Sequence, residues 1–66
     1  MDRAKIINLI DEYSALSGLK QTTICQYALA NRKFYQRLKG GYFHETQAQR
    51  LAEWIVNNPA SERVSQ

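Results

Sequence analysis

The sequence predicts an all-α fold, a compact bundle of four helices, with an additional fifth element as an alternative. Three observations lead to this prediction. Apolar residues recur at helical spacing in four segments, Asp2 and Asn31 precede two of those segments as N-cap residues, and glycines or a proline stand where three of them end. The four helices are expected at about residues 3–17, 21–29, 32–39 and 46–57.

The first helix is predicted between two residues that mark its ends. Asp2 can cap its start, and Gly18 can end it because glycine tolerates the left-handed backbone that follows many helices. Leu19 is expected to anchor the connection to the second helix by burying its side chain. The apolar face of the first helix consists of Ile6, Ile7, Leu9, Ile10, Tyr13 and Leu16.

Residues 21 to 40 are predicted to form the second and third helices around a short turn. Lys20 is a poor N-cap, so a threonine hydroxyl is expected to cap the second helix, and Asn31 is expected to cap the third. The inward stripe of the second helix is Ile24, Cys25, Ala28 and Leu29, and that of the third is Phe34, Tyr35 and Leu38. Gly40 and Gly41 are expected to end the third helix.

The outward side of the third helix is predicted to contact DNA. At about 100° per residue, one arc of that helix presents Arg32, Lys33, Gln36 and Arg37. Arginine pairs with guanine edges and glutamine with adenine edges, so these four are the predicted base contacts. Phosphate contacts are predicted at Lys20, Gln21, Thr22, Thr23, Asn31 and Lys39. A solvated charged face is the alternative, but residues 31–40 hold no acid and a helix braces them.

This stretch resembles the helix-turn-helix of phage-repressor and Cro-type regulators, with residues 21–40 as its twenty positions. The motif places apolar residues at its fourth, eighth, tenth, fifteenth and eighteenth positions, and a small residue at its fifth. The matching residues are Ile24, Ala28, Ala30, Tyr35 and Leu38, with Cys25 as the small one. The ninth position usually carries glycine for the turn, and Leu29 departs from this. The segments GLKQTTICQYAL and NRKFYQRLKGG are also similar to very small phage and prophage regulators, including those that accompany anti-CRISPR genes.

The fourth helix is predicted to begin at Thr46, after a loop from which Tyr42 or Phe43 folds back onto the core, and to end before Pro59. Its core stripe is Ala48, Leu51, Ala52 and Ile55. Trp54 and Val56 lie off that stripe and are the predicted homodimer interface, with a core position as the alternative for Trp54. Residues 1–58 form the predicted domain, and 59–66 a flexible tail.

Composition narrows the functional class. The 66 residues carry a net charge of +3 and 44% hydrophobic residues, as expected for one small globular domain with an anionic partner. One cysteine and one lone histidine, His44, provide no disulfide and no metal site, and no cofactor is expected. No segment has the length of a membrane span, so a cytoplasmic protein is expected. No catalytic residue set is present, so an enzyme is not expected.

The expected function is sequence-specific binding of double-stranded DNA in the major groove. One module of this size covers a single half-site, so a homodimer on an inverted repeat is expected, with half-site centres about 34 Å apart. Small size and the resemblance imply a transcriptional repressor that regulates its own operon. The alternative is a helical module that binds another protein through the Trp54 face and does not bind DNA.

Overall fold

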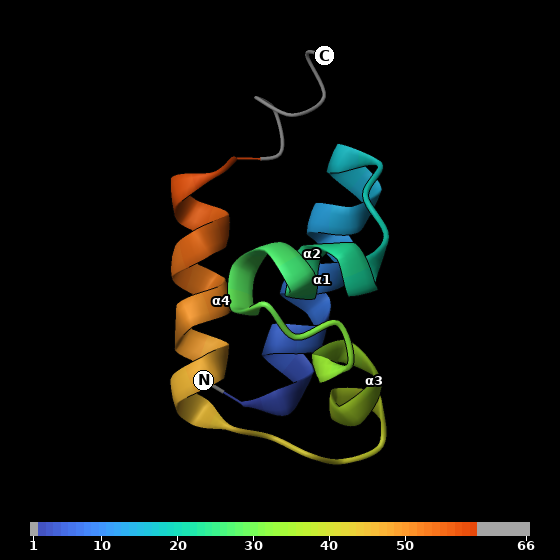
Figure 1. Ribbon diagram of the computed structural model, residues 1–66, viewed down its shortest axis with the longest axis vertical. Helices are drawn as coiled ribbons and strands as arrows, with labels where there is room; N and C mark the ends of the chain where they lie inside the picture. Colours follow the sequence, from blue (N-terminus) through green and yellow to red (C-terminus); the bar gives the residue numbers. More distant parts are fainter. Residues whose placement is uncertain (1, 60–66) are drawn as a thin grey trace.

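The computed structural model describes residues 2–59, and within them the chain forms four α-helices and no strand. The helices are α1 (Arg3–Ser17), α2 (Gln21–Leu29), α3 (Phe34–Lys39) and α4 (Glu45–Asn57). In Figure 1, α4 runs along the left side of the molecule and α3 lies at the lower right, and the loop that joins them passes along the bottom. The predicted all-α fold of four helices is confirmed.

The ends of α1 follow the sequence prediction. The Asp2 side chain accepts a hydrogen bond of 2.8 Å from the backbone N–H of Lys5, which satisfies one of the free donors at the helix start. Gly18 adopts φ 79° and donates its N–H to the carbonyl of Ser14 at 2.9 Å. A residue with a side chain would be strained in this conformation, so glycine ends α1 without strain.

Two helices begin at residues other than those expected. The third was expected to begin at Arg32 under an Asn31 cap, but α3 begins at Phe34, and Arg32 and Lys33 form a turn before it. The fourth begins at Glu45 rather than Thr46. The residue at the N-cap position of α2 is Lys20, and its side chain makes no capping hydrogen bond. The threonine that was expected to cap this helix is therefore not the N-cap residue.

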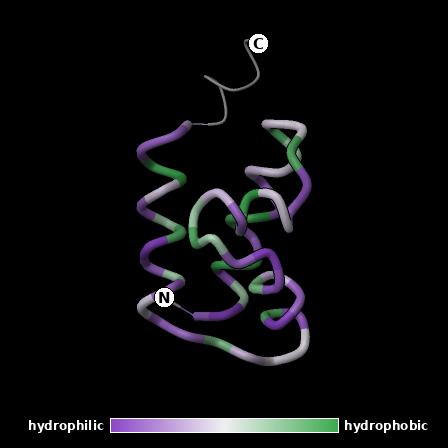
Figure 2. The backbone as a smooth tube through the Cα atoms, viewed as in Figure 1, coloured by the Kyte–Doolittle hydropathy of each residue, from purple (hydrophilic) through white to green (hydrophobic). Residues whose placement is uncertain are grey.

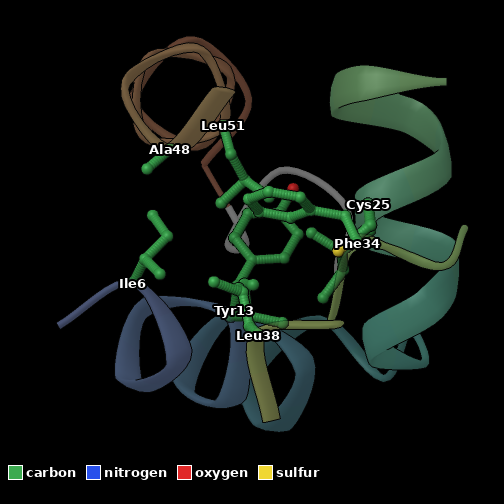
Figure 3. Close-up of a cluster of buried hydrophobic side chains, with 9 residues drawn as sticks. Ile6, Tyr13, Cys25, Phe34, Leu38, Ala48 and Leu51 are labelled. Carbon is green, nitrogen blue, oxygen red and sulfur yellow. The ribbon is translucent and has the colours of Figure 1, made fainter. Parts of the chain in front are cut away.

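All four helices contribute to one hydrophobic core (Figure 3). The buried residues are Ile6, Ile10, Tyr13, Ile24, Cys25, Phe34, Leu38, Ala48 and Leu51. Hydrophobic positions of α4 lie on the side of that helix turned towards the other helices (Figure 2). Leu19 and Phe43 pack against the core as predicted. Leu16 was expected on the core face, but it is 65% exposed.

Ala30 carries the conformation that glycine would normally supply between α2 and α3. It has φ 55°, in the left-handed region, and its N–H donates to the carbonyl of Gln26 at 2.9 Å. The sequence motif places glycine one residue earlier, at the position of Leu29, but Leu29 is the last residue of α2. A left-handed conformation costs a non-glycine residue roughly 1–2 kcal/mol, so Ala30 stores strain in this turn.

Replacing Ala30 with glycine is expected to raise the free energy of unfolding by about 0.5–1 kcal/mol, because glycine removes the left-handed penalty but loses more chain entropy on folding. Chemical denaturation measures this change. The matched control is Ala15→Gly, since Ala15 is an exposed residue within α1. There glycine should lower stability by about 0.5–1 kcal/mol. Destabilisation by Ala30→Gly would contradict the left-handed conformation of Ala30.

Candidate nucleic-acid interface

The turn before α3 is organised by Asn31, although Asn31 is not the helix cap. Its side-chain oxygen accepts a 3.2 Å hydrogen bond from the N–H of Lys33, and its carbonyl accepts one of 3.3 Å from the N–H of Phe34. An asparagine side chain that bonds two residues ahead closes a local turn of its own. Arg32 and Lys33 are therefore presented on a turn that leads into the helix.

The predicted base-contacting side chains all reach the surface, at four positions within the six residues from 32 to 37. Arg32, Lys33, Gln36 and Arg37 are all exposed. Behind them, Phe34 and Leu38 are fully buried against the core. The apolar half of α3 thus fixes the helix to the domain, and the basic and amide side chains remain free to meet a ligand.

The residues predicted to contact phosphate lie in three places. Lys20 and the residues Gln21, Thr22 and Thr23 begin α2, with Lys20 exposed and the other three half-buried. The first helical hydrogen bond of α2 is donated by Ile24 to the carbonyl of Lys20 at 3.0 Å. Asn31 is half-buried in the turn, and Lys39 is exposed at the end of α3.

A carboxylate on α1 connects α3 to the start of α2. Asp11 accepts a 2.6 Å hydrogen bond from the hydroxyl of Tyr35 and a longer hydrogen bond, 3.5 Å, from the side-chain amide of Gln21. The hydrogen bond to Asp11, together with burial and the nearby negative charge, raises the pKa of Tyr35 to about 12, so the hydroxyl keeps its proton. The ammonium of Lys39 lies 5.8 Å from the centre of the Tyr35 ring, within reach of a cation–π contact.

The carboxyl end of α3 is held by the beginning of α1. The guanidinium of Arg3 donates a 2.7 Å hydrogen bond to the carbonyl of Leu38, in the last turn of α3. A cation at this end also offsets the partial negative charge of the helix terminus. Sequence reasoning assigned no role to Arg3 or Asp11, because their partners lie 35 and 24 residues away along the chain.

The two predicted dimer residues of α4 have different surroundings. Trp54 is half-buried, and its ring centre lies 5.4 Å from that of Tyr13 and 6.3 Å from that of Tyr27. Trp54 therefore packs against the core of its own chain, and its part in a homodimer interface stays a prediction. Val56 is 74% exposed and lies between two surface hollows. The hollow between α1 and α4 is lined by Leu9, Glu12, Tyr13, Leu16, Ile55, Val56 and Pro59.

The lone cysteine and the lone histidine lie in different environments. Cys25 is buried, and burial raises the pKa of its thiol to about 11, so the reactive thiolate is disfavoured. His44 is exposed, and its ring lies beside that of Tyr42. Residues 2–59 contain no cluster of three or more potential metal ligands and no helix that is long and apolar enough to cross a membrane. The predicted tail lies outside the described residues, apart from Pro59.

Comparisons of the chain with protein-family models, with curated proteins and with solved structures find no match. The function therefore has to be inferred from the residues themselves.

Proposed function

We propose that this protein binds double-stranded DNA through α3 and the turn before it, and that it acts as a transcriptional regulator. The observation that carries the proposal is the exposed set Arg32, Lys33, Gln36 and Arg37, supported from behind by two fully buried side chains of α3. Arginine and glutamine match the hydrogen-bonding pattern of base edges in the major groove, and lysine adds attraction to phosphate. The proposed role of the protein is binding rather than catalysis, and its proposed location is the cytoplasm.

Repression is the proposed direction of regulation. A small domain bound at a promoter can block the polymerase without any further surface, so occlusion is the simplest mechanism for a chain of this size. An operator within the protein's own operon would then make the regulation autogenous. The proposed binding unit is a homodimer on an inverted repeat, because two modules give the affinity that one half-site does not.

Selection of bound fragments from a random pool of DNA duplexes tests this function. The expected result is a recurring inverted repeat, whose affinity falls steeply as salt is added because neutralised phosphates release counterions. Recovery of no common sequence, together with no binding of any duplex at low salt, would refute the DNA-binding function.

The exposed apolar hollow between α1 and α4 favours a second candidate function. Leu16 and Val56 are 65% and 74% exposed at its edge, and such apolar surface is typical of a contact with another protein. A helical module that binds a partner protein there would need no DNA. Binding that responds little to added salt would support this candidate, since an apolar contact releases no counterions.

Within the DNA-binding proposal, a second copy of the chain covers this hollow. None of the predicted DNA-contacting residues lines it, so a dimer formed there leaves the basic side chains uncovered. Val56→Asp is expected to convert the dimer to a monomer, because it would bury an unpaired charge. Sedimentation equilibrium measures the change. Asn8→Asp is the control, since it adds the same charge at an exposed position of α1 and should leave the dimer intact. A Val56→Asp variant that remains a dimer would place the interface elsewhere.

A further inference from the structure

The hydrogen bonds of Asp11 tie together the two parts of the proposed DNA-binding surface. Tyr35 is on α3, and Gln21 is the first residue of α2, where phosphate contacts are predicted. Both side chains meet the same Asp11 oxygen, at 2.6 Å and 3.5 Å. Neither partner is buried in the core, so the carboxylate acts at the edge of the surface rather than beneath it.

The short length of α3 makes such an external contact important. The helix has six residues, and its buried side chains are Phe34 and Leu38, which lie one turn apart along the same side. Two anchors on one line leave rotation about the helix axis weakly constrained. Tyr35 points to a different side, and its hydroxyl is fixed by a charged acceptor on α1. Together with the bond from Arg3 to the carbonyl of Leu38, this contact restrains the rotation of α3, and with it the direction of Gln36 and Arg37.

We infer that Asp11 is a positioning residue for sequence recognition: through Tyr35 it fixes the orientation of α3, and through Gln21 it fixes the start of α2 relative to that helix. The inference rests on the proposed DNA-binding function. Base contacts depend on the direction of each hydrogen bond, whereas attraction to phosphate depends mainly on charge. Loss of the Asp11 contacts should therefore reduce discrimination between DNA sequences more than it reduces affinity for DNA in general.

The test compares a duplex selected by the wild-type protein with a scrambled duplex of the same length. Tyr35→Phe removes one hydroxyl without changing charge, and it is expected to lower the ratio of the two affinities about tenfold, as loss of a hydrogen bond to a charged group implies. Affinity for the scrambled duplex should stay within about twofold. The matched control is Tyr42→Phe, which removes the hydroxyl of an exposed tyrosine whose ring meets His44, and it should leave the ratio unchanged.

Asp11→Ala completes the experiment. It removes a negative charge near the basic side chains, so affinity for the scrambled duplex should rise, and the ratio of the two affinities should fall as it does in Tyr35→Phe. The double variant should lower the ratio no further than the larger single effect, because both changes break the same contact. Thermal unfolding shows which variants are folded at the measuring temperature. Should Asp11→Ala unfold, Tyr35→Phe decides the question alone.

The outcomes separate this inference from the function on which it rests. If the wild-type protein selects no common sequence and binds no duplex at low salt, the DNA-binding proposal itself fails. If it binds duplexes without selecting a sequence, sequence recognition fails, and the positioning role of Asp11 fails with it. If it selects one, and Tyr35→Phe then changes the affinity ratio no more than Tyr42→Phe does, the positioning role of Asp11 is refuted and the DNA-binding function stands. An equal loss of affinity on both duplexes would also refute it, since that pattern indicates a contribution to stability only.

Discussion

Replacing Phe34 with alanine is expected to unfold the protein. Phe34 is fully buried between the helices, and removing a buried phenyl ring costs about 3–5 kcal/mol through lost apolar contact and the cavity that remains. A chain of 66 residues has a total stability of roughly 3–10 kcal/mol, so the loss is a large part of the whole. Circular dichroism during chemical denaturation measures the effect, and DNA binding should disappear with the helical signal.

The matched control for this change is Tyr42→Ala. Tyr42 is an aromatic residue eight positions further along the chain, but it is 42% exposed and its ring meets His44 rather than the core. Its replacement should change the free energy of unfolding by no more than about 0.5 kcal/mol. Comparable losses in the two variants would show that Phe34 is not the central core residue of this fold.

Replacing Arg32 or Gln36 with alanine should cost about 1–3 kcal/mol of binding energy on the selected operator and relax the preference at one base pair. Arg32 lies in the turn before α3 and Gln36 within the helix, and both are exposed, so neither change should affect folding. Affinities for operator and random duplexes across a salt series measure the effect. The physical reason is the loss of a directional hydrogen bond to a base edge.

Lys39→Ala is the comparison that separates base reading from phosphate attraction. Lys39 is exposed at the end of α3, and its loss should weaken all duplexes about equally and reduce the salt slope by about one. Arg32→Ala and Gln36→Ala should reduce operator affinity selectively. If these two variants weakened operator and random DNA equally, with base preference unchanged, α3 would have no part in reading sequence.

The sequence predicted α1, α2 and the end of α4 well because local signals marked their ends. Asp2 and Gly18 each act on backbone groups within four residues, so their effects can be inferred without knowledge of the fold. The start of α3 was missed for a related reason. The Asn31 side chain can either cap a helix or close a local turn by accepting a hydrogen bond from a residue two positions ahead. The structure contains the turn, with the N–H of Lys33 as the donor.

Structural features that depend on residues distant in the sequence could not be predicted from the sequence pattern. Helical spacing placed Leu16 on the inward face of the first helix, but α4 does not cover it, and the hollow there stays open. The left-handed conformation of Ala30 could not be predicted, because no glycine stands at that position. Asp11 has an ordinary polar position within α1, and its hydrogen bond with Tyr35 on α3 could not be inferred from helical spacing. The exposed positions of Arg32, Lys33, Gln36 and Arg37 were predicted, and their contacts with DNA remain a proposal.

The bond between Tyr13 and Asn58 has a consequence for how the protein is made. The Tyr13 hydroxyl on α1 donates to a carbonyl 45 residues later, directly after α4, and α4 also supplies Ala48 and Leu51 to the core. A nascent chain that has reached only α3 therefore lacks the helix that closes the core. During translation α3 then has no complete support behind it, so the basic surface gains its fixed shape only after the ribosome has added Asn58. We infer that folding follows synthesis of α4.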